Sequence, residues 1–270
     1  MSQPKEPTIQ IPPIENRLSE ATWETHREFL EEYRRIRERE GRGSRDAEFY
    51  LQLPEGNFTG HRAKEWAMRA DSLSWIHAHL KSCESKLSIL DAGAGNCWLT
   101  RYIAEWGHHV VALDLNEDDE DGLGAGRHYL EQLPLTFRRV LADFSALPFA
   151  DGSFDLIVYN GALHYAPDVA LCIAEGTRCL KPGGEILLID TPFYRDAADG
   201  EKMLAERGGP QQARYLTYRM LNEIAAGCEL SVQYEHRTRS LLQAMKRRLA
   251  ERLRGRSFAQ MPWVKLRKSV

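Results

Sequence analysis

The segment from Ser88 to Thr100, SILDAGAGNCWLT, combines an apolar run, an acid and two glycines separated by one residue. A short apolar run followed by a helical pattern predicts a strand, a tight turn and a helix. Gly93 and Gly95 let the backbone approach a ligand closely, because a Cβ at either position would occupy ligand space or forbid the required dihedral angles. Doubly wound sheets bind their ligands at such a turn, beyond the carboxyl end of the strand.

A second acid, Asp114, ends the next predicted strand. A carboxylate there is placed to accept hydrogen bonds from two ribose hydroxyls, so we expect a nucleoside ligand. Dinucleotide turns have the pattern GxGxxG or GxGxxA, in which the third small residue brings the helix close to a pyrophosphate. Trp98 occupies that position here. Trp98 and the acid Asp91 therefore favour a nucleoside that carries a positive charge in place of phosphates, such as S-adenosylmethionine.

Five segments together resemble the motifs of class I S-adenosylmethionine-dependent methyltransferases, most closely the small-molecule, methyltransferase type 11 kind. In chain order they read ILDAGAGN, VVALDL, LADFSALPFADGSFDLI, VYNGALHY and LKPGGEILLID. The resemblance implies a Rossmann-like α/β fold with a seven-stranded, mostly parallel sheet and an antiparallel last strand. It also implies S-adenosyl-L-methionine as the cofactor.

By this resemblance, the first four motifs are each expected to contact the cofactor. Asp114 is expected to bind the ribose, and Leu115 to contact the adenine face. Asp143 is expected to pair with the exocyclic amine of the adenine, while the backbone amide of Phe144 faces the ring. Asn160 is expected to meet the methionine portion. The complete predicted cofactor set is Asp91, Gly93, Ala94, Gly95, Asp114, Leu115, Asp143, Phe144 and Asn160.

Methyl transfer from a sulfonium is an in-line displacement, so the protein must chiefly hold a nucleophile about 3 to 3.5 Å from the methyl group. An alcohol or a carbon acid needs a general base, whereas an amine can lose its proton late. His164, in the fourth motif, is the candidate catalytic base, and the alternative is a hydrogen-bonded wall residue. Arg69 is a candidate partner that binds the methionine carboxylate through its guanidinium group. The alternative is that Arg69 is a solvated surface arginine. No cluster has metal-ligand spacing, so no metal site is expected.

The pattern divides the chain into three parts. Residues 1–18 are rich in proline and predict a disordered tail. Residues 19–82 predict an N-terminal helical extension that caps the acceptor site, with two long helices joined by the loop FYLQLPEGNFTG. Residues 83–270 alternate short apolar runs with helical stretches, which predicts the βα units of a methyltransferase catalytic domain. Its strands are predicted at 87–91, 109–114, 136–141, 154–159, 185–190, 229–236 and 263–266.

Charge is unevenly distributed along the chain. The net charge is −3, yet residues 237–270 contain eleven Lys and Arg residues and a single acid. A helix predicted over 240–254 combines these cations with an apolar stripe. The stripe either packs on the sheet, with the cations solvated, or lies on an anionic membrane surface as a peripheral contact. RNA binding is a third reading, although the chain contains no RNA-binding module and no strong nucleic-acid signal.

The predicted function is methyl transfer from S-adenosylmethionine to a small-molecule acceptor, a lipid-soluble compound being one option. The alternatives are a catalytically idle S-adenosylmethionine-binding or scaffold protein and an RNA methyltransferase. The chain contains no apolar stretch of transmembrane length and no signal-peptide core, so we expect a soluble, cytoplasmic protein.

Overall fold

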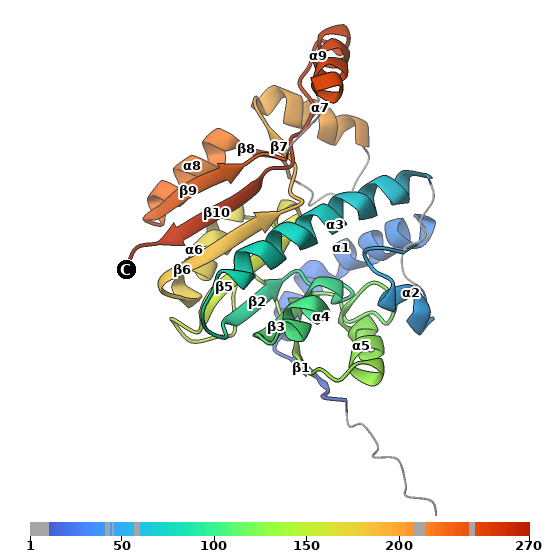
Figure 1. Ribbon diagram of the computed structural model, residues 1–270, viewed down its shortest axis with the longest axis vertical. Coiled ribbons are helices and arrows are strands. Elements are labelled where there is room, and N and C mark those ends of the chain that lie inside the picture. Colours follow the sequence, from blue (N-terminus) through green and yellow to red (C-terminus); the bar gives the residue numbers. More distant parts are fainter. Residues whose placement is uncertain (1–10, 41–43, 45, 57–59, 208–213, 238–240) are drawn as a thin grey trace, which may run out of the picture.

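The computed structural model describes residues 11–40, 44, 46–56, 60–207, 214–237 and 241–270. Its main feature is an eight-stranded sheet with helices on both faces (Figure 1). In spatial order the strands are β1 (Ile14–Asn16), β4 (Arg138–Leu141), β3 (His109–Asp114), β2 (Ser88–Ala92), β5 (Phe154–Asn160), β6 (Leu180–Ile189), β10 (Trp263–Lys268) and β9 (Leu230–Glu235). β10 is antiparallel to both neighbours and the other pairs are parallel. This topology confirms the predicted Rossmann-like sheet with an antiparallel last strand.

The eighth strand, β1, comes from the segment that the sequence predicts as part of a disordered tail. That prediction is wrong for residues 14–16, which pair in parallel with β4, whereas residues 1–10 lie outside the described residues. The edge strand β4 offers unpaired backbone groups, and its arginines hold the new strand in place. Arg138 makes an ion pair with Glu15 at 2.7 Å, and Arg139 Nη2 donates to the carbonyl oxygen of Pro12 at 2.8 Å.

Two hydrophobic cores lie on opposite faces of the sheet. Successive residues of β5 alternate between them, with Ile157 in one core and Leu156 and Val158 in the other. Because both faces are covered, the central strands β2, β3 and β5 carry buried apolar residues on both faces, which is typical of parallel sheets. One face carries α6 (Val169–Cys179) and α8 (Tyr218–Gly227), and the other carries α3 (Gly60–Lys81), α4 (Trp98–Glu105) and α5 (Arg127–Gln132).

The N-terminal extension contributes α1 (Glu20–Arg39) and α2 (Ala47–Leu51) in addition to α3. Ser19 caps α1 by accepting a hydrogen bond from the amide of Thr22 at 3.1 Å. The predicted loop between the two long helices is partly wrong, because its first residues belong to α2, which is too short to show a helical period; residues 57–59 lie outside the described residues. Tyr50 of α2 is fully buried and donates a hydrogen bond to the carbonyl oxygen of Glu120.

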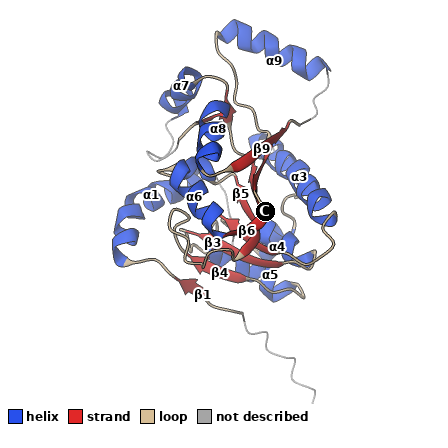
Figure 2. Cartoon of the chain, turned by 90° about the vertical axis from the view of Figure 1, so that its left-hand side faces the viewer, coloured by secondary structure: helices blue, strands red, loops and turns tan. Residues whose placement is uncertain are grey.

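The C-terminal part adds elements beyond the main sheet. A two-stranded parallel sheet joins β7 (Phe193–Tyr194) and β8 (Leu216–Thr217), and α7 (Ala197–Arg207) lies between these strands in sequence. The helix α9 (Leu241–Arg254) stands clear of the sheet and its covering helices in both views (Figures 1 and 2). Two short 3-10 helices, η1 (Leu123–Gly126) and η2 (Leu163–Tyr165), follow β3 and β5.

Candidate active site

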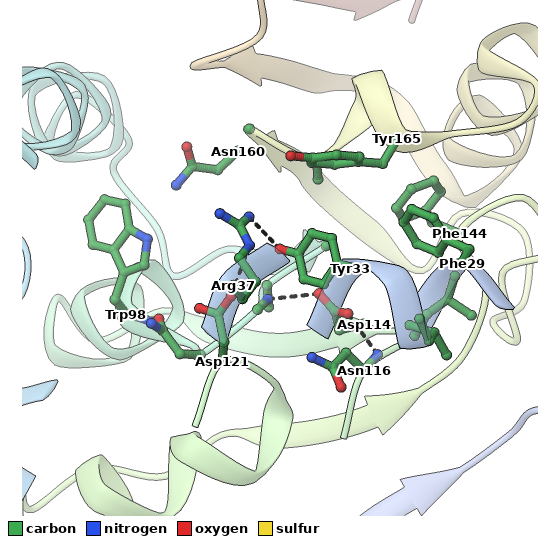
Figure 3. Close-up of a pocket in the computed structure, with 18 of the residues that line it drawn as sticks. Phe29, Tyr33, Arg37, Trp98, Asp114, Asn116, Asp121, Phe144, Asn160 and Tyr165 are labelled. Atoms are coloured by element: carbon green, nitrogen blue, oxygen red, sulfur yellow. Dashed lines mark hydrogen bonds and ion pairs between the residues drawn. The ribbon is translucent and has the colours of Figure 1, made fainter. Parts of the chain in front are cut away.

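A cavity lies where β2, β3, β4 and β5 end, and α1 and the first half of α3 complete its wall (Figure 3). This is the switch point of the sheet, because β3 and β4 lie on one side of β2, and the chain then crosses to β5 and β6 on the other side. Eight of the predicted cofactor residues line it: Gly93, Ala94, Gly95, Asp114, Leu115, Asp143, Phe144 and Asn160. Their shared position at the strand ends brings four separate motifs to one cavity.

The glycine turn after β2 has two different physical requirements. Gly93 has a φ of +79°, and a Cβ there would overlap the methyl group of Ala162 in the turn after β5. Gly95 has a φ of +51°, and its missing Cβ leaves open space in which the nearest atom is the carbonyl oxygen of Asp121, 3.7 Å away. Gly93 is therefore needed to pack two turns together, whereas Gly95 keeps the cavity open.

Asp114 ends β3 with its carboxylate held in place by backbone amides. One oxygen accepts a hydrogen bond from the amide of Gly95 at 2.8 Å, and the other accepts from the amide of Asn116 at 2.8 Å. Burial raises the pKa of Asp114 to about 6, although these two amides oppose the shift. The carboxylate is thus oriented before any ligand arrives, with lone pairs that remain for hydroxyl donors.

Asp91 is the predicted cofactor residue that the structure does not place on the cavity wall. Its side chain is buried, and Oδ2 accepts a hydrogen bond from Thr100 Oγ1 of α4 at 2.6 Å. Burial raises the pKa of Asp91 to about 7, against the opposing hydrogen bond from Thr100. Within the described part of the chain, Asp91 Oδ1 is buried and has no hydrogen-bond partner. Direct contact between Asp91 and the cofactor stays a prediction.

Side chains of α1 form a part of the cavity wall that could not be predicted from the sequence motifs. His26 Nε2 lies 2.8 Å from Asp143 Oδ2, and both side chains are buried, at 5% and 9% exposure. The other oxygen of Asp143 accepts a hydrogen bond from the amide of Ser145 at 2.8 Å. Burial alone would raise the pKa of Asp143, but the hydrogen bonds from His26 and Ser145 outweigh it and lower the pKa. His26 therefore fastens α1 to the loop that follows β4.

A second contact fastens α1 to the acidic loop that follows β3. Arg37 makes an ion pair with Asp121 at 3.1 Å and donates a hydrogen bond to the hydroxyl of Tyr33. Figure 3 shows the side chains of Tyr33 and Arg37 pointing from α1 into the cavity. The ring of Tyr33 packs edge to face on Tyr165, with centroids 5.6 Å apart, and Phe29 lies beside both rings. Burial raises the pKa of Tyr33, so this phenol is neutral at physiological pH.

The candidate base, His164, is not among the residues that line the cavity. It precedes Tyr165 in η2, and the two ring centroids are 4.2 Å apart, so Tyr165 takes the position on the wall. The catalytic role of His164 stays a prediction. Arg69 does line the cavity, where its guanidinium contacts the Trp66 ring at 4.4 Å and donates to Glu65 at 2.9 Å.

Among the described residues, no three His, Cys, Asp or Glu side chains are grouped so that they could hold a metal ion. Within the same part of the chain, every helix is too short or too polar to cross a bilayer.

Comparisons with known proteins agree with this geometry. Residues 90–188 match the family model described as a methyltransferase domain. A malonyl-[acyl-carrier protein] O-methyltransferase of Erwinia billingiae is 34% identical over 102 residues, which cover 37% of this chain and 37% of that protein. The chain thus matches well under half the length of this relative.

Two solved structures share the fold. The YcgJ protein of Bacillus subtilis has a TM-score of 0.59 and 17% identity, covering 74% of this chain and 99% of its own. The 1,6-didemethyltoxoflavin-N1-methyltransferase of Burkholderia thailandensis has a TM-score of 0.54 and 19% identity, and the match covers all of both chains. At these identities the likeness concerns the fold alone.

Proposed function

We propose that the protein is a class I methyltransferase that transfers a methyl group from S-adenosyl-L-methionine to a small-molecule acceptor, a proposal supported by the match of residues 90–188 to a methyltransferase domain. The observation that carries the proposal is the meeting of the glycine turn, Asp114, Asp143 and Asn160 at one cavity beneath α1. We assign residues 83–270 to the catalytic domain and residues 19–82 to a cap over the acceptor.

The residues on the cavity wall fit this cofactor. Asp114 offers an oriented carboxylate to the ribose, and Asp143 and Phe144 offer a carboxylate and a ring to the adenine. Among the described residues, Asn160 Oδ1 is buried without a hydrogen-bond partner although Asn160 lines the cavity. A buried carbonyl oxygen of this kind is stabilised by a donor such as the ammonium group of the methionine portion. When bound, the cofactor supplies a methyl group activated by its sulfonium.

The cap would hold the acceptor and keep water out. Phe29, Tyr33 and Tyr165 form an aromatic cluster that favours a flat, apolar acceptor. Arg69 and Glu65 of α3 add one charged group of each sign to the lining. The two relatives named above act on unlike acceptors, one on a protein-bound malonyl group and one on a didemethyltoxoflavin. We therefore infer the acceptor class from this lining rather than from the relatives.

The test is transfer of labelled methyl groups to a cell extract. Purified protein and methyl-labelled cofactor would be incubated with the extract, which is then separated into lipid, metabolite, protein and RNA fractions. We expect label in the metabolite or lipid fraction, and little label with Asp114→Ala. Asp151→Asn is the matched control, because the Asp151 side chain is 80% exposed and lies outside the cavity lining.

Two outcomes would contradict the proposal. Label found only in RNA would indicate an RNA methyltransferase. Retained cofactor binding without label in any fraction would instead support an idle S-adenosylmethionine-binding protein, the alternative from a different functional class.

A further inference from the structure

The helix α9 leaves the sheet at the edge where the candidate active site lies. It connects the end of β9 to the start of β10, and Glu235 and Trp263 are paired across these strands. Val264 pairs with Leu188 near the carboxyl end of β6, so this start point lies at the edge where the parallel strands end. Figures 1 and 2 show α9 projecting from this edge, away from the sheet and its covering helices.

An apolar stripe along α9 is exposed. Met245, Leu249 and Leu253 are spaced four residues apart, which places them on one face of the helix. Their exposed fractions are 68%, 60% and 78%, so none of the three packs on the sheet. Of the two readings that the sequence left open, packing of the stripe on the sheet is therefore wrong for these residues. Exposed apolar side chains that gather on one helix mark an interaction surface rather than an average surface.

Cations surround this stripe. Arg248, Arg252 and Arg254 are exposed, and the only acid of the helix, Glu251, is half-buried and accepts a hydrogen bond from the amide of Phe258 at 3.1 Å. Within α9 itself there are five Lys and Arg residues and one acid, whereas the net charge of the chain is −3. The rest of the chain is therefore acidic. An anionic surface would attract this end of the molecule and repel the remainder, which fixes an orientation.

We propose that α9 docks the protein on an anionic lipid surface, with the Met245, Leu249 and Leu253 stripe in the headgroup region and the arginines among the phosphates. A second copy of the chain that packed its own α9 on the stripe would bring like-charged helices together. RNA would neutralise the arginines but leave the stripe in water. A lipid surface satisfies both features of the helix.

This docking would bring the active-site edge of the sheet toward the membrane. The consequence, which rests on the proposed methyl transfer, is that acceptors dissolved in lipid could reach the cavity. The docking itself is tested without any measurement of activity, so the failure of one proposal is distinguishable from the failure of the other.

The experiment is sedimentation of the full chain with vesicles. Vesicles of phosphatidylcholine alone would be compared with vesicles that contain about 30% phosphatidylglycerol, at low and at high salt. We expect at least tenfold tighter binding to the anionic vesicles, and loss of most of this binding in high salt. Arg248→Gln and Arg252→Gln should each weaken binding about fivefold. Leu249→Ser should weaken binding at both salt concentrations by about tenfold.

Matched controls come from exposed residues elsewhere on the surface. Leu171 on α6 is 47% exposed and Arg219 on α8 is 86% exposed, so Leu171→Ser and Arg219→Gln should leave vesicle binding unchanged. Because the replaced side chains of α9 are exposed, the melting temperatures of its variants should equal that of the parent.

Four results would overturn the proposal. The first three are equal binding to both kinds of vesicle, no binding to either kind, and control variants whose vesicle binding is weakened as much as that of the α9 variants. The fourth is a concentration-dependent dimer that Leu249→Ser disrupts, which would assign the stripe to a second copy of the chain.

Discussion

Replacement of His26 by alanine is expected to lower the free energy of unfolding by about 2 to 3 kcal/mol. The contact removed is the 2.8 Å hydrogen bond between His26 and Asp143, whose side chains are 5% and 9% exposed. An exposed ion pair contributes less than about 1 kcal/mol, whereas loss of one partner from a fully buried pair costs about 3 to 5 kcal/mol. Asp143 keeps the amide of Ser145 on its other oxygen, so the cost falls below that upper range.

The assay is a double-mutant cycle of His26→Ala, Asp143→Ala and the double variant, measured by urea unfolding. We expect a coupling free energy of about 1.5 to 3 kcal/mol and a melting temperature lower by roughly 4 to 12 °C for His26→Ala. His26→Gln keeps a donor near the position of Nε2 and should recover part of the loss. A coupling below about 0.5 kcal/mol would refute the reasoning, because independent sites reach that value.

The same pair has a predictable pH dependence. The pKa of Asp143 is lowered from its ordinary value of 3.8, so the stabilisation is complete above that value and is lost as the pH falls through the lower pKa of the folded state. The difference in stability between the parent and His26→Ala should therefore shrink only below about pH 4. Unfolding curves from pH 3 to pH 7 measure this window, and a difference that disappears near neutral pH would contradict the assignment.

Three further predictions concern the cavity and its closure. Asp114→Ala should weaken cofactor binding roughly 5- to 150-fold, equivalent to about 1 to 3 kcal/mol, and an unchanged dissociation constant in calorimetry would remove Asp114 from the ribose site. Burial raises the pKa of Asp91 to about 7. The protonated Asp91 carboxyl therefore stabilises the folded state at low pH, and this stabilisation is lost as the pH rises through about 7. The asparagine side chain of the Asp91→Asn variant does not titrate, so the melting temperature of this variant should not show that loss. Arg37→Ala breaks the partly buried pair with Asp121, so limited proteolysis should cut α1 about 5- to 30-fold faster than in the parent, and equal rates would show that the pair does not hold the helix.

The cofactor side of the cavity could be predicted from local sequence. The bounds of β3 agree with the prediction at both ends, because the apolar run indicates the strand and the acid that follows it indicates where the strand ends. Gly93 and Gly95 have the positive φ angles that the turn requires. Such requirements depend on a few neighbouring residues, and for that reason they are visible in the sequence.

The α1 side of the cavity could not be predicted in the same way. His26 and Asp143 are separated by 117 residues, and a histidine in a polar helix gives no sign of a buried carboxylate partner. The strand β1 has only three residues, which is too short for an alternating pattern. His164 follows a motif strand as predicted, yet Tyr165 rather than His164 lines the cavity, because the short helix η2 sets which side chain points inward.

By itself the sequence determined the positions along the chain of seven of the eight strands of the main sheet, and the turn with its flanking acids, because strand, turn and helix preferences act over a few residues. Only the tertiary structure decided that α1 crosses the strand ends, that its aromatic residues enclose the cavity and that the α9 stripe is left uncovered. These features depend on contacts between distant segments, whose free energy comes from burial and ion pairing that no local pattern records.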